Sequence, residues 1–132
     1  MAEKLKINTD GASKGNPGRA SIGVTIKDEK GKLLKSISQS IGHATNNEAE
    51  YQAIIIALKE AKKLGASSVE LLSDSELVVH QINGRYRVKK TNLRPLYLEV
   101  TALAQSFEAF RIRHIPRSLN AQADRLANLA FE

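Results

Sequence analysis

Strand-like and helix-like segments alternate along this chain, and the order in which they alternate is the strongest constraint on its fold. Alternating apolar and polar residues predict strands, and apolar residues three and four apart predict helices. Strands are expected at residues 4–10, 20–27, 32–41, 69–73 and 110–116, and helices at 46–64, 75–83, 95–106 and 120–131. This order predicts an α/β fold, with a partly parallel sheet whose faces are covered by helices. The length of 132 residues suits one domain, spanning residues 1–132, and is too short for two.

The ends of the helical segments carry recognisable capping residues. Thr45, followed three residues later by Glu48, has the pattern of a capping box at the start of the long helix. Gly65 follows the last helical residue, where a helix commonly ends. Asn120 is expected to cap the final helix through its side chain.

Turns and loops are predicted from glycine, proline and charge. The segment GASKGNPG at 11–18 is typical of a turn cluster, and DEKG at 28–31 is typical of a hairpin connection. The basic segment 85–94 has no helical or strand periodicity and is expected to be a loop.

Four carboxylates occupy positions where charge is costly unless something pairs with it. Asp10 and Asp74 each end an apolar run, and Asp124 lies in the first turn of the last helix. Glu50 lies on the apolar stripe of the long helix, whereas Glu48 is turned away from that stripe by roughly 200°. Each position also has a purely structural explanation: a turn residue, a helix cap, a charge at a helix start or a tolerated polar residue.

The expected sheet brings these acids together. Asp10 and Asp74 close two strands that, if parallel and adjacent, release their carboxylates at one edge. Carboxylate oxygens are the usual ligands of Mg²⁺, and two such ions can clamp the attacking and leaving oxygens of a phosphoryl transfer. The pattern therefore favours a metal site for phosphate chemistry.

Charge and composition favour a polyanionic partner. The chain has 20 Lys and Arg residues against 14 Asp and Glu, a net charge of +6. It has no cysteine, no apolar run long enough to span a membrane and no signal-peptide pattern. A cytoplasmic protein that is not bound to a membrane is expected, and simple solubility remains an alternative explanation of the charge.

Four motifs together resemble the ribonuclease H type 1 family. They are TDGASKGNPG (9–18), ATNNEAE (44–50), LLSDSELVV (71–79) and HIPRSLNAQADRLANLA (114–130). The resemblance implies a five-stranded mixed sheet flanked by helices, and hydrolysis of RNA within RNA/DNA hybrids. That activity would depend on Mg²⁺ or Mn²⁺ and leave 5′-phosphate and 3′-hydroxyl ends. The family's four metal-binding acids would fall on Asp10, Glu50, Asp74 and Asp124.

The same resemblance implies a surface that contacts the hybrid. The glycine-rich segment would meet the RNA, the two asparagines at the helix start would reach the minor groove and a strand backbone, and the basic loop would grip the DNA. The residues are Gly11, Ala12, Ser13, Asn16, Asn46, Asn47, Arg85, Arg87, Lys89 and Lys90. A simple turn at 16–18 and a solvated basic loop are the structural alternatives. The basic loop is short, and no separate hybrid-binding domain is expected.

A fifth participant is harder to assign. Many bacterial members of the family place a histidine in a loop before the last helix, and His114 lies ten residues before Asp124. However, His114 falls within the predicted strand 110–116, so we favour Arg117, with His114 as the alternative. An arginine stays protonated and would contact phosphate rather than act as a base.

Two other functions are weighed against the hybrid nuclease. A catalytically silent domain of the same fold would bind nucleic acid without cleaving it, and the complete set of acids speaks against it. A side activity on double-stranded RNA stays open. No organic cofactor is expected, and we expect a monomer.

Overall fold

One mixed sheet forms the centre of the structure, a computed structural model that describes residues 3–132. The strands lie in the order β3-β2-β1-β4-β5. They are β1 (Glu3–Gly15), β2 (Gly18–Lys27), β3 (Leu33–Ala44), β4 (Ala66–Ser73) and β5 (Ala109–His114). The first three strands pair antiparallel, while β1, β4 and β5 run parallel. The predicted five-stranded mixed sheet is therefore confirmed.

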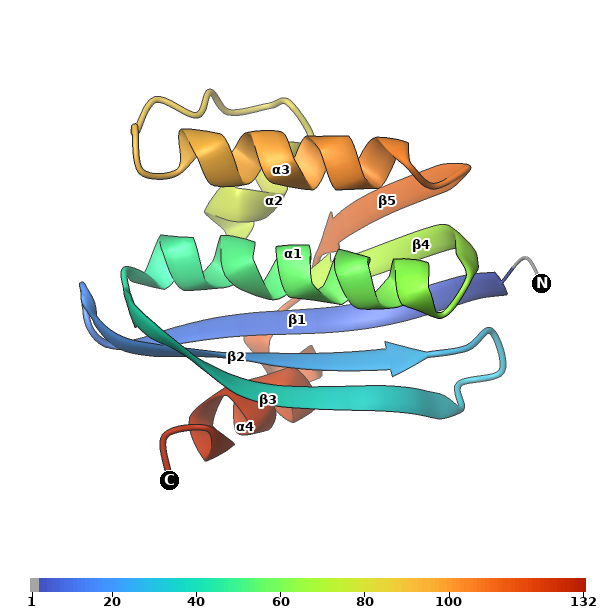
Figure 1. The fold of residues 1–132 in the computed structure, drawn as a ribbon, viewed down its shortest axis with the longest axis horizontal. Helices are drawn as coiled ribbons and strands as arrows, with labels where there is room; N and C mark the ends of the chain where they lie inside the picture. Colours follow the sequence, from blue (N-terminus) through green and yellow to red (C-terminus); the bar gives the residue numbers. More distant parts are fainter. Residues whose placement is uncertain (1–2) are drawn as a thin grey trace.

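Helices cover both faces of this sheet. They are α1 (Asn46–Lys63), α2 (Glu76–Ile82), α3 (Arg94–Gln105), the short 3₁₀ helix η1 (Arg117–Leu119) and α4 (Ala121–Leu129). In Figure 1, α1 lies against one face with α2 and α3 beyond it, and α4 lies against the opposite face. The order of strands and helices matches the order predicted from the sequence. None of the helices in the described range combines the length and apolar character needed to cross a bilayer.

The long helix α1 begins and ends as its capping residues predict. The Thr45 hydroxyl accepts a hydrogen bond from the Glu48 backbone N–H at 3.1 Å, and Glu48 Oε1 accepts one from the Thr45 N–H at 2.7 Å. Gly65 follows the helix with a φ of 80°, a conformation that glycine adopts without strain. Fully buried Ile54 and Leu58 confirm that the apolar stripe of α1 faces the core.

The prediction for the first strand was wrong in one respect. Residues 11–15 do not form a turn, because they continue β1 and pair with residues 18–22 of β2. Only Asn16 and Pro17 form the connection. The pairing with β4 stops at Thr9, so the rest of β1 pairs with β2 alone, while β2 continues to pair with β3 on its other side. Asp10 consequently lies within its strand rather than at its end.

The predicted cap of the last helix was also wrong. Asn120 occupies the position before α4, but its side chain makes no capping hydrogen bond. Instead, its Nδ2 donates to the Thr9 carbonyl at 2.9 Å, and its Oδ1 accepts from Asn8 Nδ2 at 3.0 Å. The side chain is buried against β1, so Asn120 ties the start of α4 to the central strand.

Two glycines allow the helices to lie directly on the sheet. A Cβ atom on Gly11 would lie 2.3 Å from the Ala49 carbonyl carbon in α1, and one on Gly23 would lie 2.1 Å from the Ala123 carbonyl oxygen in α4. Both distances are far below a normal contact. These glycines therefore set how closely α1 and α4 approach β1 and β2.

Candidate active site

Three carboxylates from separate elements meet at one edge of the sheet. One oxygen from each of Asp10, Glu50 and Asp74 lies within 4.8 Å of the other two. The sheet explains the positions of Asp10 and Asp74. Thr9 of β1 pairs with Ser73 of β4, and each acid directly follows one of these two residues. The parallel, adjacent strands that the sequence predicted thus place Asp10 and Asp74 side by side.

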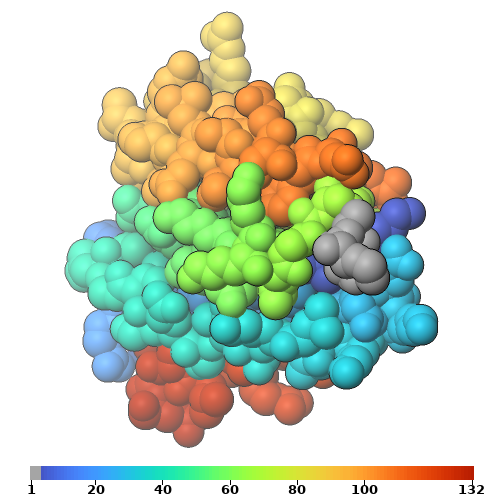
Figure 2. Space-filling view, turned by 45° about the vertical axis from the view of Figure 1, so that its right-hand side comes forward, coloured from blue at the N-terminus to red at the C-terminus, as the bar shows by residue number. Residues whose placement is uncertain are grey.

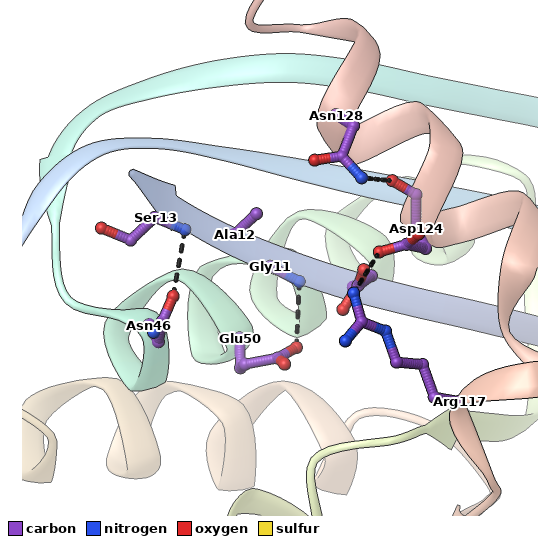
Figure 3. Close-up of a pocket in the computed structure, with 9 residues that line it drawn as sticks. Gly11, Ala12, Ser13, Asn46, Glu50, Arg117, Asp124 and Asn128 are labelled. Atoms are coloured by element: carbon purple, nitrogen blue, oxygen red, sulfur yellow. Dashed lines mark hydrogen bonds and ion pairs between the residues drawn. The ribbon is translucent and has the colours of Figure 1, made fainter. Parts of the chain in front are cut away.

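The backbone of β1 orients the third carboxylate. The Gly11 N–H donates a hydrogen bond to Glu50 Oε1 at 2.9 Å (Figure 3). Glu48 is held in the capping box at the helix start and contributes nothing to this cluster. The helix therefore supplies Glu50 and not Glu48, as the periodicity predicted.

Asp124 lies beside the cluster rather than inside it. Its Oδ1 lies 3.6 Å from Arg117 Nη2, and its side chain is near enough to Asp10 to help raise the pKa of that carboxyl. In Figure 3, Asp124 projects from α4 toward Arg117 above the β1 strand. Three of the four acids consequently form a tight group, and the fourth, Asp124, lies beside Asp10 at the margin of that group.

Burial and mutual repulsion change the acidity of the cluster. Burial, followed by the charges of Asp74 and Asp124 and a hydrogen bond with Asp124, raises the pKa of Asp10 to about 8. Burial and the charges of Asp10 and Asp74 also raise the pKa of Glu50 well above its ordinary value. The cluster therefore retains protons near neutral pH in the absence of a cation.

The donor set fits a hard divalent cation. All the gathered groups are carboxylates, and Mg²⁺ and Mn²⁺ prefer oxygen ligands. A bound cation would supply the positive charge that this group of acids lacks, and would displace their protons. Asp10, Glu50 and Asp74 are the residues placed to hold it, with Asp124 beside them.

A cleft of about 300 Å³ opens over this cluster. Its walls come from β1, the start of α1, the loop before α4 and α4 itself (Figure 3). The lining residues are Asp10, Gly11, Ala12, Ser13, Asn46, Glu50, Arg117, Asp124 and Asn128. Asn128 was not predicted, although its place one helical turn after Asp124 was a signal in the sequence.

Comparisons with known proteins agree with this arrangement. The family described as reverse transcriptase-like matches residues 8–130. The ribonuclease H1 of Halobacterium salinarum superimposes with a TM-score of 0.95 at 38% identity, covering 97% of each chain. The chain belongs to the ribonuclease H type 1 family.

Two further relatives are informative. The LC11 ribonuclease H1 isolated from compost, crystallised in complex with an RNA/DNA hybrid, has a TM-score of 0.91 and 42% identity over 96% of this chain and 95% of that one. A bifunctional protein of Mycobacterium tuberculosis is 44% identical over 98% of this chain but only 36% of its own length. The chain thus spans about a third of that curated relative.

The asparagines expected to contact the hybrid also join the two walls of this ribonuclease H cleft. Asn46 Oδ1 accepts a hydrogen bond from the Ser13 N–H, and the Asn46 N–H donates to Asn16 Oδ1, both at 3.0 Å. Asn46 lines the cleft, while Asn16 and Asn47 do not. Asn16 therefore has a structural role at the hairpin connection beside the contact predicted for it.

The basic loop lies apart from the cleft. Arg85, Arg87, Lys89 and Lys90 are exposed, between α2 and α3, and none of them lines it. Figure 2 shows this segment, in yellow, projecting at one end of the molecule. Contact with nucleic acid through these residues requires a ligand that extends beyond the cleft.

The two candidates for the fifth participant differ in position. Arg117 lies in η1 at the rim of the cleft, close to Asp124. His114 is the last residue of β5, is exposed and does not line the cleft. The structure therefore places Arg117, and not His114, beside the acids, while the role of Arg117 stays a prediction.

Proposed function

We propose that this chain is an endonuclease that hydrolyses the RNA strand of RNA/DNA hybrids, leaving 5′-phosphate and 3′-hydroxyl ends. The observation that carries the proposal is the group of Asp10, Glu50 and Asp74, whose oxygens lie within 4.8 Å of one another; Asp10 and Glu50 of this group line an open cleft. The hybrid bound by the LC11 relative supports the choice of substrate.

The four acids would act through bound cations. Two divalent ions held by Asp10, Glu50, Asp74 and Asp124 would supply an activated water and a stabilised 3′ leaving oxygen. The protein's own part is to fix the carboxylates: the Gly11 N–H orients Glu50, and the register of β1 and β4 places Asp10 beside Asp74.

Recognition of RNA would come from the wall formed by Gly11, Ala12 and Ser13. This segment lines the cleft next to the acids, where it can contact a ribose 2′-hydroxyl, the group that separates RNA from DNA. Asn46 faces the same space. The Arg117 guanidinium at the opposite rim would contact phosphate and stay charged throughout the reaction.

Cleavage of matched substrates tests the proposal. A labelled RNA/DNA hybrid, a double-stranded RNA and a double-stranded DNA of one sequence should be incubated with the protein in Mg²⁺ and then in Mn²⁺. We expect internal cuts in the RNA of the hybrid and none in DNA. Cuts in double-stranded RNA would add the side activity that the sequence left open. Binding without cleavage in either metal would instead favour a silent nucleic-acid-binding domain.

A further inference from the structure

Two basic side chains face each other near the tip of the β1–β2 hairpin. Lys14 of β1 and Arg19 of β2 are direct partners in the antiparallel register, and both are exposed. Like charges directly opposite each other on two strands repel and destabilise the pair. A second group is therefore needed to explain why this pair is placed here.

One aromatic ring holds both cations. The Lys14 Nζ lies 4.9 Å from the centre of the Phe131 ring, and the Arg19 guanidinium carbon lies 5.7 Å from it. Each distance allows a cation–π interaction. Phe131 itself is tied to the end of α4, because its N–H donates to the Asn128 carbonyl at 3.1 Å. Both positive groups therefore lie beside the same ring, which neutralises neither of them.

This basic pair and Phe131 lie outside the cleft lining, and they follow the lining residues along β1 and α4. Asp10, Ala12 and Lys14 alternate along β1 and so share one face of the sheet. Lys14 follows Asp10 by four positions along the strand, a separation of roughly 13 Å. Along the other wall, Asp124 and Asn128 of α4 line the cleft (Figure 3), and Phe131 follows three residues later.

We propose that Lys14 and Arg19, held together by Phe131, bind a backbone phosphate of the nucleic acid that occupies the cleft. This inference rests on the proposed function, since it assigns a further contact to the same ligand. Two cations held beside one ring suit a phosphodiester, whose oxygens can accept charge-assisted hydrogen bonds from both. The distance of Lys14 from Asp10 equals at most roughly four bases, at the ~3.4 Å rise per base of a duplex strand. The bound phosphate should therefore lie within that number of bases of the acids.

A pair of double variants tests the site. Lys14→Gln with Arg19→Gln removes both charges and keeps a polar, unbranched side-chain stem at each position. Lys30→Gln with Lys32→Gln removes the same charge from the connection between β2 and β3, away from the cleft, and serves as the matched control. Both are made with Asp10→Asn, and binding of a short hybrid is measured by fluorescence anisotropy in Mg²⁺ at several salt concentrations. Thermal unfolding of each variant shows whether it is folded.

The Lys14 and Arg19 variant is expected to bind about tenfold more weakly at low salt, with the slope of log Kd against log salt reduced by about one. The control is expected to keep the parent slope. Equal slopes in the two double variants would overturn the site and leave the basic pair a structural partner of Phe131 only.

Single neutral methylphosphonates, placed in turn along each strand of the hybrid, locate the phosphate. A methylphosphonate at one position should weaken binding by the parent protein and have no effect on binding by the Lys14 and Arg19 variant. The strand that carries this position, RNA or DNA, is the one whose phosphate the pair binds. The absence of any such position would also overturn the inference. Failure of the wild-type protein to cleave hybrids would reject the proposed function separately, because the binding slopes do not depend on cleavage.

Discussion

The Gly11 N–H and Glu50 Oε1 are joined by a 2.9 Å hydrogen bond between the central strand and the long helix. The contact exists because α1 lies so close to β1 that a Cβ at residue 11 would meet the Ala49 carbonyl carbon at 2.3 Å. A sheet backbone group thus orients a helix carboxylate directly.

Gly11→Ala should therefore damage stability and cleavage together. The added methyl group must push α1 away from β1, at a cost of about 1–3 kcal/mol in the free energy of unfolding. Urea unfolding and initial cleavage rates measure both effects. Gly31→Ala is the control, since Gly31 has a φ of 85° with open space around it. That change should cost about 1 kcal/mol and leave the rate unchanged. An unperturbed Gly11→Ala protein would contradict the close approach.

Glu50→Gln should lower the cleavage rate and spare stability, whereas Glu48→Ala should lower stability and spare the cleavage rate. The first keeps the shape of the side chain but removes a carboxylate from the group, so cleavage should fall by at least a hundredfold while the protein stays folded. The second breaks the capping box and should cost about 0.5–1 kcal/mol of stability with little change in rate. Circular dichroism melting and hybrid cleavage distinguish them. Loss of activity in Glu48→Ala alone would reverse the assignment.

The Asp10 carboxyl should make the metal-free protein less stable as pH rises. Its pKa of about 8 in the fold lies above the value of 3.8 expected when it is exposed, so the folded state binds more protons between these values. Stability is therefore lost as pH increases through this window. Asp10→Asn removes the effect, so the variant should be more stable than the wild type by several kcal/mol at pH 8 and by less at pH 5.

Urea unfolding in the presence of a chelator checks this sign. Glu50 keeps its own raised pKa, so the variant should retain part of the pH dependence. Added Mg²⁺ should stabilise the wild type at pH 8 more than the variant. A variant no more stable than the wild type at pH 8 without metal would contradict the repulsion within the cluster. Asp10→Asn should also abolish hybrid cleavage.

Arg117→Ala should lower cleavage by about tenfold or more, because it removes a fixed charge near Asp124 at the rim of the cleft. His114→Ala should change the rate less than twofold, since His114 lies outside the cleft lining. Steady-state kinetics of both variants on one hybrid provide the comparison. A large loss in His114→Ala with none in Arg117→Ala would restore the histidine as the fifth participant.

Much of the fold was predictable because local signals agreed with the tertiary contacts. The capping box at Thr45 and Glu48 and the apolar stripe through Ile54 act within one helix, so the sequence alone contains them. The predicted range of the first strand was too short, because residues 11–15 are rich in glycine and serine, as turns are. Pairing with β2 overrides that composition, and such pairing is not visible in local sequence.

The candidate site was predictable where periodicity decided it. The inward direction of Glu50 and the adjacency of Asp10 and Asp74 follow from helix and strand geometry. The burial of Asn120 against β1 and the place of Asn128 in the cleft depend on how α4 docks across the sheet, and no short-range pattern sets that docking. The catalytic roles of these residues stay predictions for the variants above.

The position of β1 in the sheet determines how the acids of the site are held. Asp10 pairs with Gly23 of β2 and lies one residue beyond the point at which the pairing of β1 with β4 ends. Asp124 lies on the nine-residue α4, whose residues Ala123 and Ala127 are fully buried. The acids therefore reach the site from both faces of the sheet, Glu50 from α1 on one side and Asp124 from α4 on the other, and a change in how either helix packs would alter the group.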